Sequence, residues 1–351
     1  MDISPILKLM VEKTASDIFF TSNSPIKIKI EGKIVNVGKT VLDAATVKAA
    51  AYKIMNEDQT QFFESNLEID FAIAEKGLGR FRVNVFTQRG NTAMVLRYIP
   101  SDVPKLDDLG LPEILKDLIL NKRGLLLMVG ATGSGKTTTL AAMINHRNEN
   151  MANHILTIED PVEFTHPNRN SIINQREVGT DTHSYHNALK SSLREAPDVI
   201  LIGEIRDRET MEAALELSGT GHLAISTLHA NNSSQTMDRV INMFPEQLHK
   251  QLFMDLALNL RGIISQRLVQ AKDGKRCAAI EIMLNTPHIA DLILKGRIDE
   301  VKEAMQESPE KGMQTFDDSL YQLYKDGKIE MEEALKNSDS RANLEAKIQF
   351  G

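Results

Sequence analysis

The stretch Gly130-Ala-Thr-Gly-Ser-Gly-Lys-Thr137 satisfies the pattern G-x-x-x-x-G-K-[ST] at every defined position. The apolar run at 125–129 before it predicts a fully buried strand, and residues 138–144 after it predict a helix. Gly133 and Gly135 allow the backbone to turn tightly and point its N–H groups at phosphate oxygens, where a helix N-terminus adds partial positive charge. The sequence therefore predicts a nucleoside triphosphate site built around this loop.

Two side chains of the loop have specific predicted roles. Lys136 would place a positive charge on the β- and γ-phosphates, and the Thr137 hydroxyl is placed to bind Mg²⁺. The whole loop and the residue after it are expected to surround the phosphates. These residues are Gly130, Ala131, Thr132, Gly133, Ser134, Gly135, Lys136, Thr137 and Thr138.

Carboxylates follow two further predicted strands. The apolar run Val199–Ile202 leads to Glu204, an arrangement in which the carboxylate holds Mg²⁺ through a water molecule or polarises the attacking water. Glu159, Asp160 and Glu163 follow another strand, and ligands of a parallel sheet lie at the carboxyl ends of its strands. One of the three is a candidate general base for water, and the pattern does not choose among them. A solvated acidic turn is the alternative interpretation of this segment.

Two histidines flank the predicted strand at 223–226. His222 precedes the strand and His229 follows it, so an extended chain separates them too far for a shared metal ion. His229 is predicted to lie close to the γ-phosphate, because it stands at the end of its strand. His222 is interpreted as a structural histidine.

Length and composition limit the functional classes. A chain of 351 residues favours two domains, and its 42% hydrophobic and 25% charged residues are typical of a soluble protein. The net charge of −7, with Lys and Arg scattered along the chain, argues against a nucleic-acid-binding surface. A single cysteine, Cys277, excludes an internal disulfide bond and a Cys₄ zinc site. With neither a signal-peptide pattern nor a membrane-length apolar run, the chain is expected to be cytoplasmic.

The order of predicted elements indicates an α+β domain followed by an α/β domain. Residues 1–99 combine period-two apolar patterns with short helices, which predicts a mostly antiparallel sheet. Residues 100–113 contain three prolines and are interpreted as a linker. Buried strands alternate with helices in 114–285, which predicts a parallel sheet, and 286–351 is predicted to be a helical appendage.

The C-terminal third has clear helix signals. Beyond residue 245 the pattern predicts helices, apart from one strand at 277–283. Thr286-Pro287 predicts an N-cap followed by proline at the first helical position, and Thr315-Phe-Asp-Asp318 resembles a capping box. The polar stretch 338–351 is expected to be a frayed tail.

These motifs, in this order, resemble those of the secretion-type ATPases that power type IV pili and type II secretion. The motifs are Walker A at 130–137, an acidic Asp box at 158–164, Walker B at 198–204 and a His box at 221–230. The similarity covers essentially the whole chain and is closest to the pilus-retraction branch, the PilT/PilU family. The stretches that look like the PilU type are Gln175–Gly179, Arg194–Asp198 and Ala290–Ile293. The missing Cys₄ site argues against the type II secretion member.

The resemblance implies a PAS-like N-terminal domain, a RecA-like P-loop ATPase domain and a ring-shaped homohexamer. It implies ATP and Mg²⁺ as ligands, Glu163 as the catalytic carboxylate and Glu204 as the Walker B residue. Arginines of the first domain reach the phosphates in this family. The matching residues here are Arg82 and Arg97, ahead of Arg80.

The resemblance also implies a motor subunit for pilus retraction and twitching motility, located in the cytoplasm and peripherally associated with the inner membrane at the pilus base. Its implied partners are a PilC-like inner-membrane platform protein and a PilT-type companion ATPase. PilT carries a stretch Ala-Ile-Arg-Asn-Leu-Ile-Arg-Glu linked to retraction, where this chain has His288-Ile-Ala-Asp-Leu-Ile-Leu-Lys295. That departure favours an accessory, PilT-dependent paralogue. The alternatives are an ATP-binding regulator of a companion motor and a RecA-like DNA translocase, against which the acidic charge counts.

Overall fold

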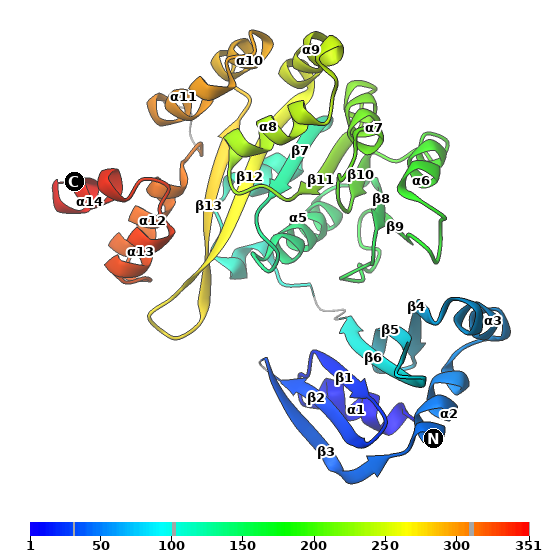
Figure 1. The fold of residues 1–351 in the computed structure, drawn as a ribbon. Coiled ribbons are helices and arrows are strands. Elements are labelled where there is room, and N and C mark those ends of the chain that lie inside the picture. The colour runs from blue at the N-terminus through cyan, green and yellow to red at the C-terminus, as the bar shows by residue number, and fades with distance from the viewer. Residues whose placement is uncertain (31, 100–102, 309–311, 351) are drawn as a thin grey trace. The chain divides into compact units, whose positions relative to one another are not determined.

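The computed structural model describes residues 1–30, 32–99, 103–308 and 312–350 (Figure 1). The chain divides into two compact units. One contains Met1–Asp102 together with Glu163–Thr165, and the other contains Val103–Val162 and His166–Gly351. The first three residues of the expected linker, 100–102, lie outside the described residues.

The first unit is built on a six-stranded sheet with the order β3-β2-β1-β6-β5-β4. Every neighbouring pair in it is antiparallel, so the predicted antiparallel sheet is confirmed. Helices α2 and α3 contact β6 and β4, respectively. The elements are α1 (Ser4–Glu12), β1 (Asp17–Phe20), β2 (Ser24–Ile30), β3 (Lys33–Leu42), α2 (Ala44–Ile54), α3 (Glu57–Asn66), β4 (Glu68–Glu75), β5 (Gly79–Gln88) and β6 (Asn91–Ile99).

Alternation along β5 explains how this sheet forms its core. Phe81, Val83 and Val85 are buried on one face, while the residues between them are only partly covered. Because successive strand side chains point to opposite faces, this pattern turns one apolar face of the sheet toward the helices and leaves the other partly solvated.

The second unit contains a seven-stranded sheet with the order β13-β12-β7-β11-β10-β8-β9 (Figure 1). All neighbours are parallel except β12 and β13, which form an antiparallel hairpin. The elements up to β11 are the short 3₁₀ helix η1 (Leu106–Leu109), α4 (Ile114–Ile119), β7 (Gly124–Val129), α5 (Lys136–Asn150), β8 (His154–Glu159), β9 (Ile172–Glu177), α6 (Tyr185–Ser192), β10 (Val199–Ile202), α7 (Arg208–Gly219) and β11 (Leu223–Leu228). The remaining elements are α8 (Ser233–Asn242), η2 (Glu246–Leu248), α9 (His249–Asn259), β12 (Leu260–Gln270), β13 (Arg276–Leu284), α10 (Pro287–Leu294), η3 (Ile298–Glu300), α11 (Val301–Glu307), α12 (Phe316–Lys325), α13 (Met331–Asn337) and α14 (Arg341–Phe350).

Strand β7 shows why the sheet of the second unit is buried on both faces. Leu125, Leu127 and Val129 belong to a core shared with α7, α8 and α9. Leu126 and Met128 belong to a second core shared with α4 and α5. A strand covered on both faces needs apolar residues at successive positions, which is the continuous run seen in the sequence.

Two expectations about the chain were wrong, and one strand was missed. The region beyond residue 245 is not helical up to 277, because β12 occupies Leu260–Gln270. Strand β9 was not predicted either. Both strands carry polar residues that are held by other parts of the fold, so their apolar periodicity is weak. The expected frayed tail contains α14, whose Leu344 is fully buried among the residues of α12 and α13.

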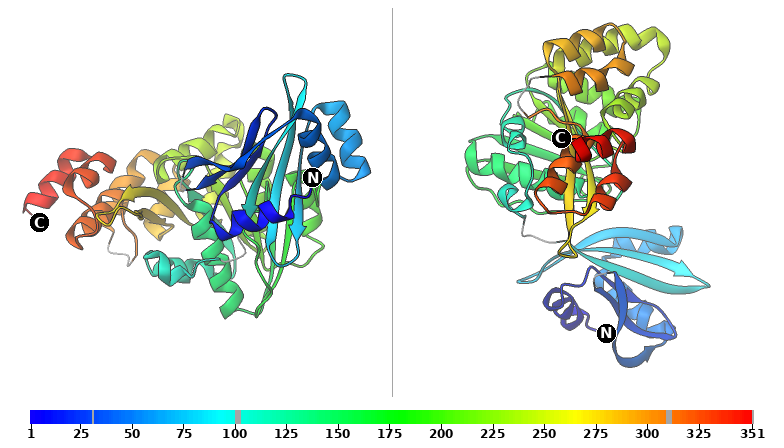
Figure 2. Two further views of the ribbon diagram at one scale, coloured as in Figure 1. Left: turned by 90° about the horizontal axis from the view of Figure 1, so that it is seen from below. Right: turned by 90° about the vertical axis from the view of Figure 1, so that its left-hand side faces the viewer.

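The predicted helix starts are confirmed. Thr286 caps α10 by accepting a hydrogen bond from the Ile289 backbone N–H, with Pro287 at the first helical position. Thr315 and Asp318 form a complete capping box at α12. The C-terminal helices, drawn in red in Figure 2, pack against the β12–β13 hairpin. Within the described residues, no helix is both long and apolar enough to cross a bilayer.

Candidate nucleotide-binding site

The predicted phosphate loop connects β7 to α5. Lys136 is the first residue of α5, and Gly135 precedes it with a φ of 86°. The Lys136 ammonium group donates hydrogen bonds to the backbone carbonyls of Gly130, at 2.6 Å, and Ala131, at 2.9 Å. Burial lowers the pKa of Lys136, and the nearby Glu204 carboxylate opposes that shift. A flexible cation is therefore held over the inside of the loop.

Strand β12 shapes the other side of the loop. A Cβ atom at Gly130 would lie 2.4 Å from the carbonyl oxygen of Gln266, and one at Gly135 would lie 2.7 Å from its side-chain Nε2. The Gln266 amide is held by Thr139 of α5, whose hydroxyl donates to Oε1 at 2.8 Å. Gly130 is required because the backbone of β12 passes so close to the loop, and Gly135 because its φ of 86° is strained for other residues.

The loop has the properties of a phosphate site. Ser134 is buried, and its hydroxyl is one of the few buried side-chain atoms in the described part of the chain without a hydrogen-bond partner. Thr137 and the residues Ala131, Thr132 and Gly133 are exposed, while Thr138 is partly covered. An unsatisfied hydroxyl, exposed N–H groups and a helix N-terminus together fit an anionic ligand.

Two cavities open from the loop. One, of about 480 Å³, extends from Gly130 and Ala131 past His229 to α8. The other, of about 280 Å³, runs along the loop to Arg267 and Leu268 of β12. The loop therefore lies between two spaces, one beside the His box and one beside β12.

Glu204 and His229 meet beside the loop. Strand β10 lies between β8 and β11, and β11 lies beside β7, so the carboxyl ends of these strands are neighbours. Oε1 of Glu204 is 3.1 Å from Nε2 of His229, and its Oε2 accepts a hydrogen bond from Arg206 at 2.8 Å. The carboxylate is thus held from two sides and faces the loop that carries Lys136.

His222 lies at the opposite end of β11 and has a structural environment. Its Nδ1 is 3.1 Å from the Leu217 carbonyl and 3.2 Å from the Thr220 hydroxyl, at the C-terminus of α7. Its interpretation as a structural histidine is confirmed. Within the described residues, no three His, Cys, Asp or Glu side chains gather into a metal site. Mg²⁺ keeps several waters and phosphate oxygens as ligands and needs few from the protein, so the Thr137 hydroxyl and the Glu204 carboxylate as its protein ligands stay a prediction.

The three candidate bases have different environments. Glu159 ends β8 and is buried, and it accepts hydrogen bonds from Thr157, at 2.7 Å, and Gln175, at 3.3 Å. Asp160 is exposed and Glu163 is partly covered. The structure therefore favours Asp160 or Glu163 over Glu159 as a base accessible to water, and Glu163 stays a prediction.

The predicted arginines share one face of the first unit's sheet. Arg82 of β5 and Arg97 of β6 are directly opposite each other, and Arg80 is two residues from Arg82 on the same strand. Arg97 donates to the buried carboxylate of Asp17 at 2.9 Å, and Arg82 lies 3.6 Å from Asp70. Two carboxylates thus hold the guanidinium groups above the sheet, and the role of these arginines at the phosphates stays a prediction.

Sequence reasoning missed three residues of the site. Arg206 pairs with Glu204, and Gln266 supports the loop. The Tyr185 hydroxyl packs so closely on Gly203 that a Cβ atom there would lie 2.7 Å from it. Burial raises the pKa of Tyr185, and the neighbouring carboxylates, Asp160 first among them, raise it further, so the phenol stays neutral. Of the three, only Arg206 could have been identified from the sequence, because it stands two residues after the Walker B carboxylate Glu204.

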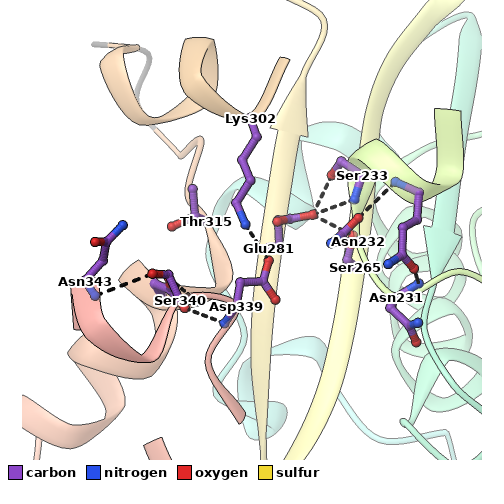
Figure 3. A network of polar contacts seen from close by, with 12 residues as sticks. Asn231, Asn232, Ser233, Ser265, Glu281, Lys302, Thr315, Asp339, Ser340 and Asn343 are labelled. Carbon is purple, nitrogen blue, oxygen red and sulfur yellow. Dashed lines mark hydrogen bonds and ion pairs between the residues drawn. The ribbon is translucent and has the colours of Figure 1, made fainter. Parts of the chain in front are cut away.

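A polar network fixes the loop that follows His229 (Figure 3). The buried Glu281 of β13 accepts hydrogen bonds from the backbone and hydroxyl of Ser233, both at 2.7 Å, and from Ser265 at 3.1 Å. Burial raises the pKa of Glu281, and these hydrogen bonds oppose the rise. Arg267, held by Asp339 at 2.7 Å, donates to the Asn231 carbonyl at 3.3 Å. The loop is therefore anchored to β12, β13 and the C-terminal helices.

The chain is similar to known proteins over almost its whole length. Residues 1–344 match the family described as type II/IV secretion system protein. The chain is 51% identical to the type IV pilus ATPase PilU of Pseudomonas aeruginosa, over 100% of this chain and 92% of that protein. It is 42% identical to the type IV pilus retraction ATPase PilT of the same organism, over 98% of this chain and 100% of that protein. Among solved structures, the pilus retraction motor PilT with bound ADP gives a TM-score of 0.92 at 41% identity, covering 98% of this chain and 99% of the other.

Proposed function

Because this chain belongs to the type II/IV secretion system protein family, we propose that it is an ATP-hydrolysing motor subunit of the type IV pilus machine. The printed name of its PilT relative supports pilus retraction, and that of a relative in Neisseria gonorrhoeae, twitching motility protein, supports twitching motility as the process it serves. The observation that carries the proposal is the meeting of Glu204 and His229, 3.1 Å apart, beside a loop that holds Lys136. A P-loop next to an oriented carboxylate is the arrangement that hydrolyses a nucleoside triphosphate.

Each residue has a role in the proposed reaction, ATP and water giving ADP and phosphate. Lys136 exchanges its two backbone carbonyls for β- and γ-phosphate oxygens. Glu163 takes a proton from the attacking water, and Glu204, held by His229, orients the ligands around the γ-phosphate. Mg²⁺, held by the Thr137 hydroxyl and through water by Glu204, supplies charge that neutralises the phosphate oxygens.

The proposal extends to assembly. We assign the first unit a PAS-like fold and the second a RecA-like fold, arranged in a homohexameric ring. ATP binding closes the two domains, and Arg82 and Arg97 neutralise charge that develops on the phosphates. The pairing of Arg97 with Asp17 supports this role, because a guanidinium held in one rotamer loses less entropy on binding.

The proposed place of the protein in the pilus machine is accessory. It works in the cytoplasm at the pilus base, with a PilT-type companion ATPase and a PilC-like inner-membrane platform protein. The 51% identity to PilU, compared with 42% to PilT, supports the PilU-type role. A regulator with little productive turnover of its own is the alternative that the experiment below separates.

Turnover of purified protein, with and without the companion ATPase, tests this function. We expect Lys136→Ala to abolish hydrolysis, because no other side chain of the loop can place a cation on the phosphates. We expect Glu163→Gln to reduce turnover roughly 10²–10⁴-fold while ATP still binds. Lys122→Ala, at an exposed lysine just before β7, is the matched control and should hydrolyse ATP normally.

The outcomes separate the alternatives. Normal turnover in a folded Lys136→Ala protein would remove the P-loop from the mechanism. Normal turnover in Glu163→Gln would move the base to Asp160. A wild-type protein that binds ATP without turnover, alone and with its companion, would favour the regulator.

A further inference from the structure

The segment that carries Glu163 is held at both of its ends by strand β9. The Val162 backbone N–H donates to Oε2 of Glu177 at 3.1 Å. The His166 backbone N–H donates to Oε1 of Gln175 at 2.8 Å. The two acceptors are two residues apart on one strand and therefore share a face of it. Only three residues, 163–165, lie between the two anchored amides.

The Glu177 anchor is itself rigid. Its side chain is 5% exposed, and its Oε1 accepts a hydrogen bond from Thr180 at 3.2 Å. Its backbone N–H donates to Asp181 at 2.9 Å, and its carbonyl accepts the N–H groups of the turn at 180–182. A carboxylate fixed in this way offers Val162 an acceptor in one place.

The Gln175 anchor is oriented by the neighbouring strand. Its Nε2 donates to Oε1 of Glu159 at 3.3 Å, which leaves its Oε1 for the His166 N–H. Glu159 in turn accepts the Thr157 hydroxyl at 2.7 Å. An acceptor on one side and a donor on the other allow the amide only one orientation. The parallel register of β8 and β9, which pairs Glu159 with Glu177, ties both anchors to the strand that leads into the segment.

We propose that Gln175 and Glu177 are positioning residues for the Glu163 carboxylate. This inference rests on the proposed function, in which Glu163 is the base. A general base must lie within hydrogen-bond reach of the water that it deprotonates, and a displacement of about 1 Å can cost about 10²-fold in rate. The two anchors limit how far the backbone of the three-residue segment can move, and with it the Glu163 carboxylate.

The inference predicts a specific kinetic signature. Gln175→Met keeps the length of the side chain and removes its hydrogen bonds to Glu159 and to the His166 backbone. We expect its kcat for ATP to fall about 10- to 100-fold, with KM and nucleotide affinity within about twofold of the wild-type values. Glu177→Met should behave in the same way. Glu177→Gln keeps an acceptor oxygen for the Val162 N–H and should therefore retain most of the wild-type kcat.

A matched control lies on the same strand. Asn174 is exposed on the opposite face of β9, and its amide oxygen contacts His154 at 2.9 Å instead of the Glu163 segment. Asn174→Leu therefore also removes an amide from β9, and it should keep the wild-type kcat. Hydrogen exchange gives a direct readout, because the His166 amide should exchange faster in Gln175→Met and at the wild-type rate in Asn174→Leu.

A double-mutant cycle distinguishes positioning from structural support. If Gln175 acts through Glu163, Gln175→Met should lower turnover in the wild type and leave the residual turnover of Glu163→Gln unchanged. An equal loss in both backgrounds would overturn the inference, as would a normal kcat in Gln175→Met. Should Gln175→Met fail to fold, Gln175→Asn, too short to span Glu159 and His166, takes its place in the cycle. Normal turnover in Glu163→Gln would refute both the assignment of Glu163 as the base and the positioning role of Gln175. Reduced turnover in Glu163→Gln together with normal turnover in Gln175→Met would refute the positioning role alone.

Discussion

His166 shows how burial of a single side chain makes stability depend on pH. The imidazole is 8% exposed, and its Nδ1 is among the buried atoms of the described chain that have no hydrogen-bond partner. Burial lowers the pKa of His166 from 6.5 to about 4. The unfolded chain therefore binds a proton at this residue between those two pH values, while the native protein does not. The contribution of His166 to the free energy of unfolding is therefore fully present above about pH 6.5 and is lost as the pH falls toward 4.

We expect His166→Leu to remove this pH dependence, because leucine fills much of the same space and does not titrate. In the wild type the free energy of unfolding should fall by at most about 3 kcal/mol between pH 6.5 and 4 through this residue. Urea unfolding at several pH values measures the difference in slope between the two proteins. Identical slopes for His166→Leu and the wild type would contradict the prediction.

At the scale of elements, the phosphate loop depends on how closely β12 approaches it. Gly130 and Gly133 both have positive φ angles, of 150° and 78°. Only Gly130 faces a fixed neighbour, because its Cβ would lie 2.4 Å from the Gln266 carbonyl oxygen, while a Cβ at Gly133 would meet nothing within 4 Å. A backbone oxygen of a paired strand cannot move aside as a side-chain tip can.

We therefore expect Gly130→Ala to be clearly more destabilising than Gly133→Ala. Both substitutions carry the left-handed backbone cost of about 1–2 kcal/mol, and Gly130→Ala adds an overlap that costs about 1–3 kcal/mol more. Denaturant unfolding of the protein without nucleotide measures both, so that phosphate binding does not contribute. Equal losses for the two variants would show that the loop and β12 separate more easily than the structure indicates.

At the scale of the whole molecule, the residues that depart from the PilT stretch lie on a surface helix. Helix α10 buries Ile289, Leu292 and Ile293, mostly toward α9, and exposes Leu294. Lys295, the residue that follows the helix as its C-cap, is exposed as well. Lys295 pairs with Asp291 at 2.7 Å on this exposed side. Charged residues at the edge of an interface affect which partner binds more than they affect how tightly it binds. The difference from the PilT stretch at 288–295 should therefore change docking to partner proteins and leave the nucleotide chemistry intact.

We expect an active ATPase that does not retract pili alone, yet supports retraction beside a catalytically inactive PilT-type partner. The measurement is the frequency of retraction in a strain that lacks the PilT-type gene and expresses this protein. A second strain, which also carries the inactive partner, is the comparison. Normal retraction in the first strain would show that the protein is a self-sufficient motor and that the interpretation of 288–295 is wrong.

The sequence by itself determined the features that depend on neighbouring residues. The P-loop, the strands before Glu204 and His229, the antiparallel first sheet and the helix caps at Thr286 and Thr315 were all predicted. Each rests on a local rule, such as a glycine turn, an apolar period or an N-cap hydroxyl. Such rules involve only a few neighbouring positions, so they hold whatever the fold of the rest of the chain.

Only the tertiary structure decided how the site is supported. Strands β9 and β12 were missed because polar residues interrupt their apolar pattern, and some of those polar side chains serve distant partners. Gln266 holds Thr139 across 127 positions of the chain, and Gln175 anchors the segment after β8. The folding of α14 likewise depends on Leu344 entering a core built by other helices. A contact between residues far apart in sequence exists only once the sheet order is set, and no periodicity in the chain records that order.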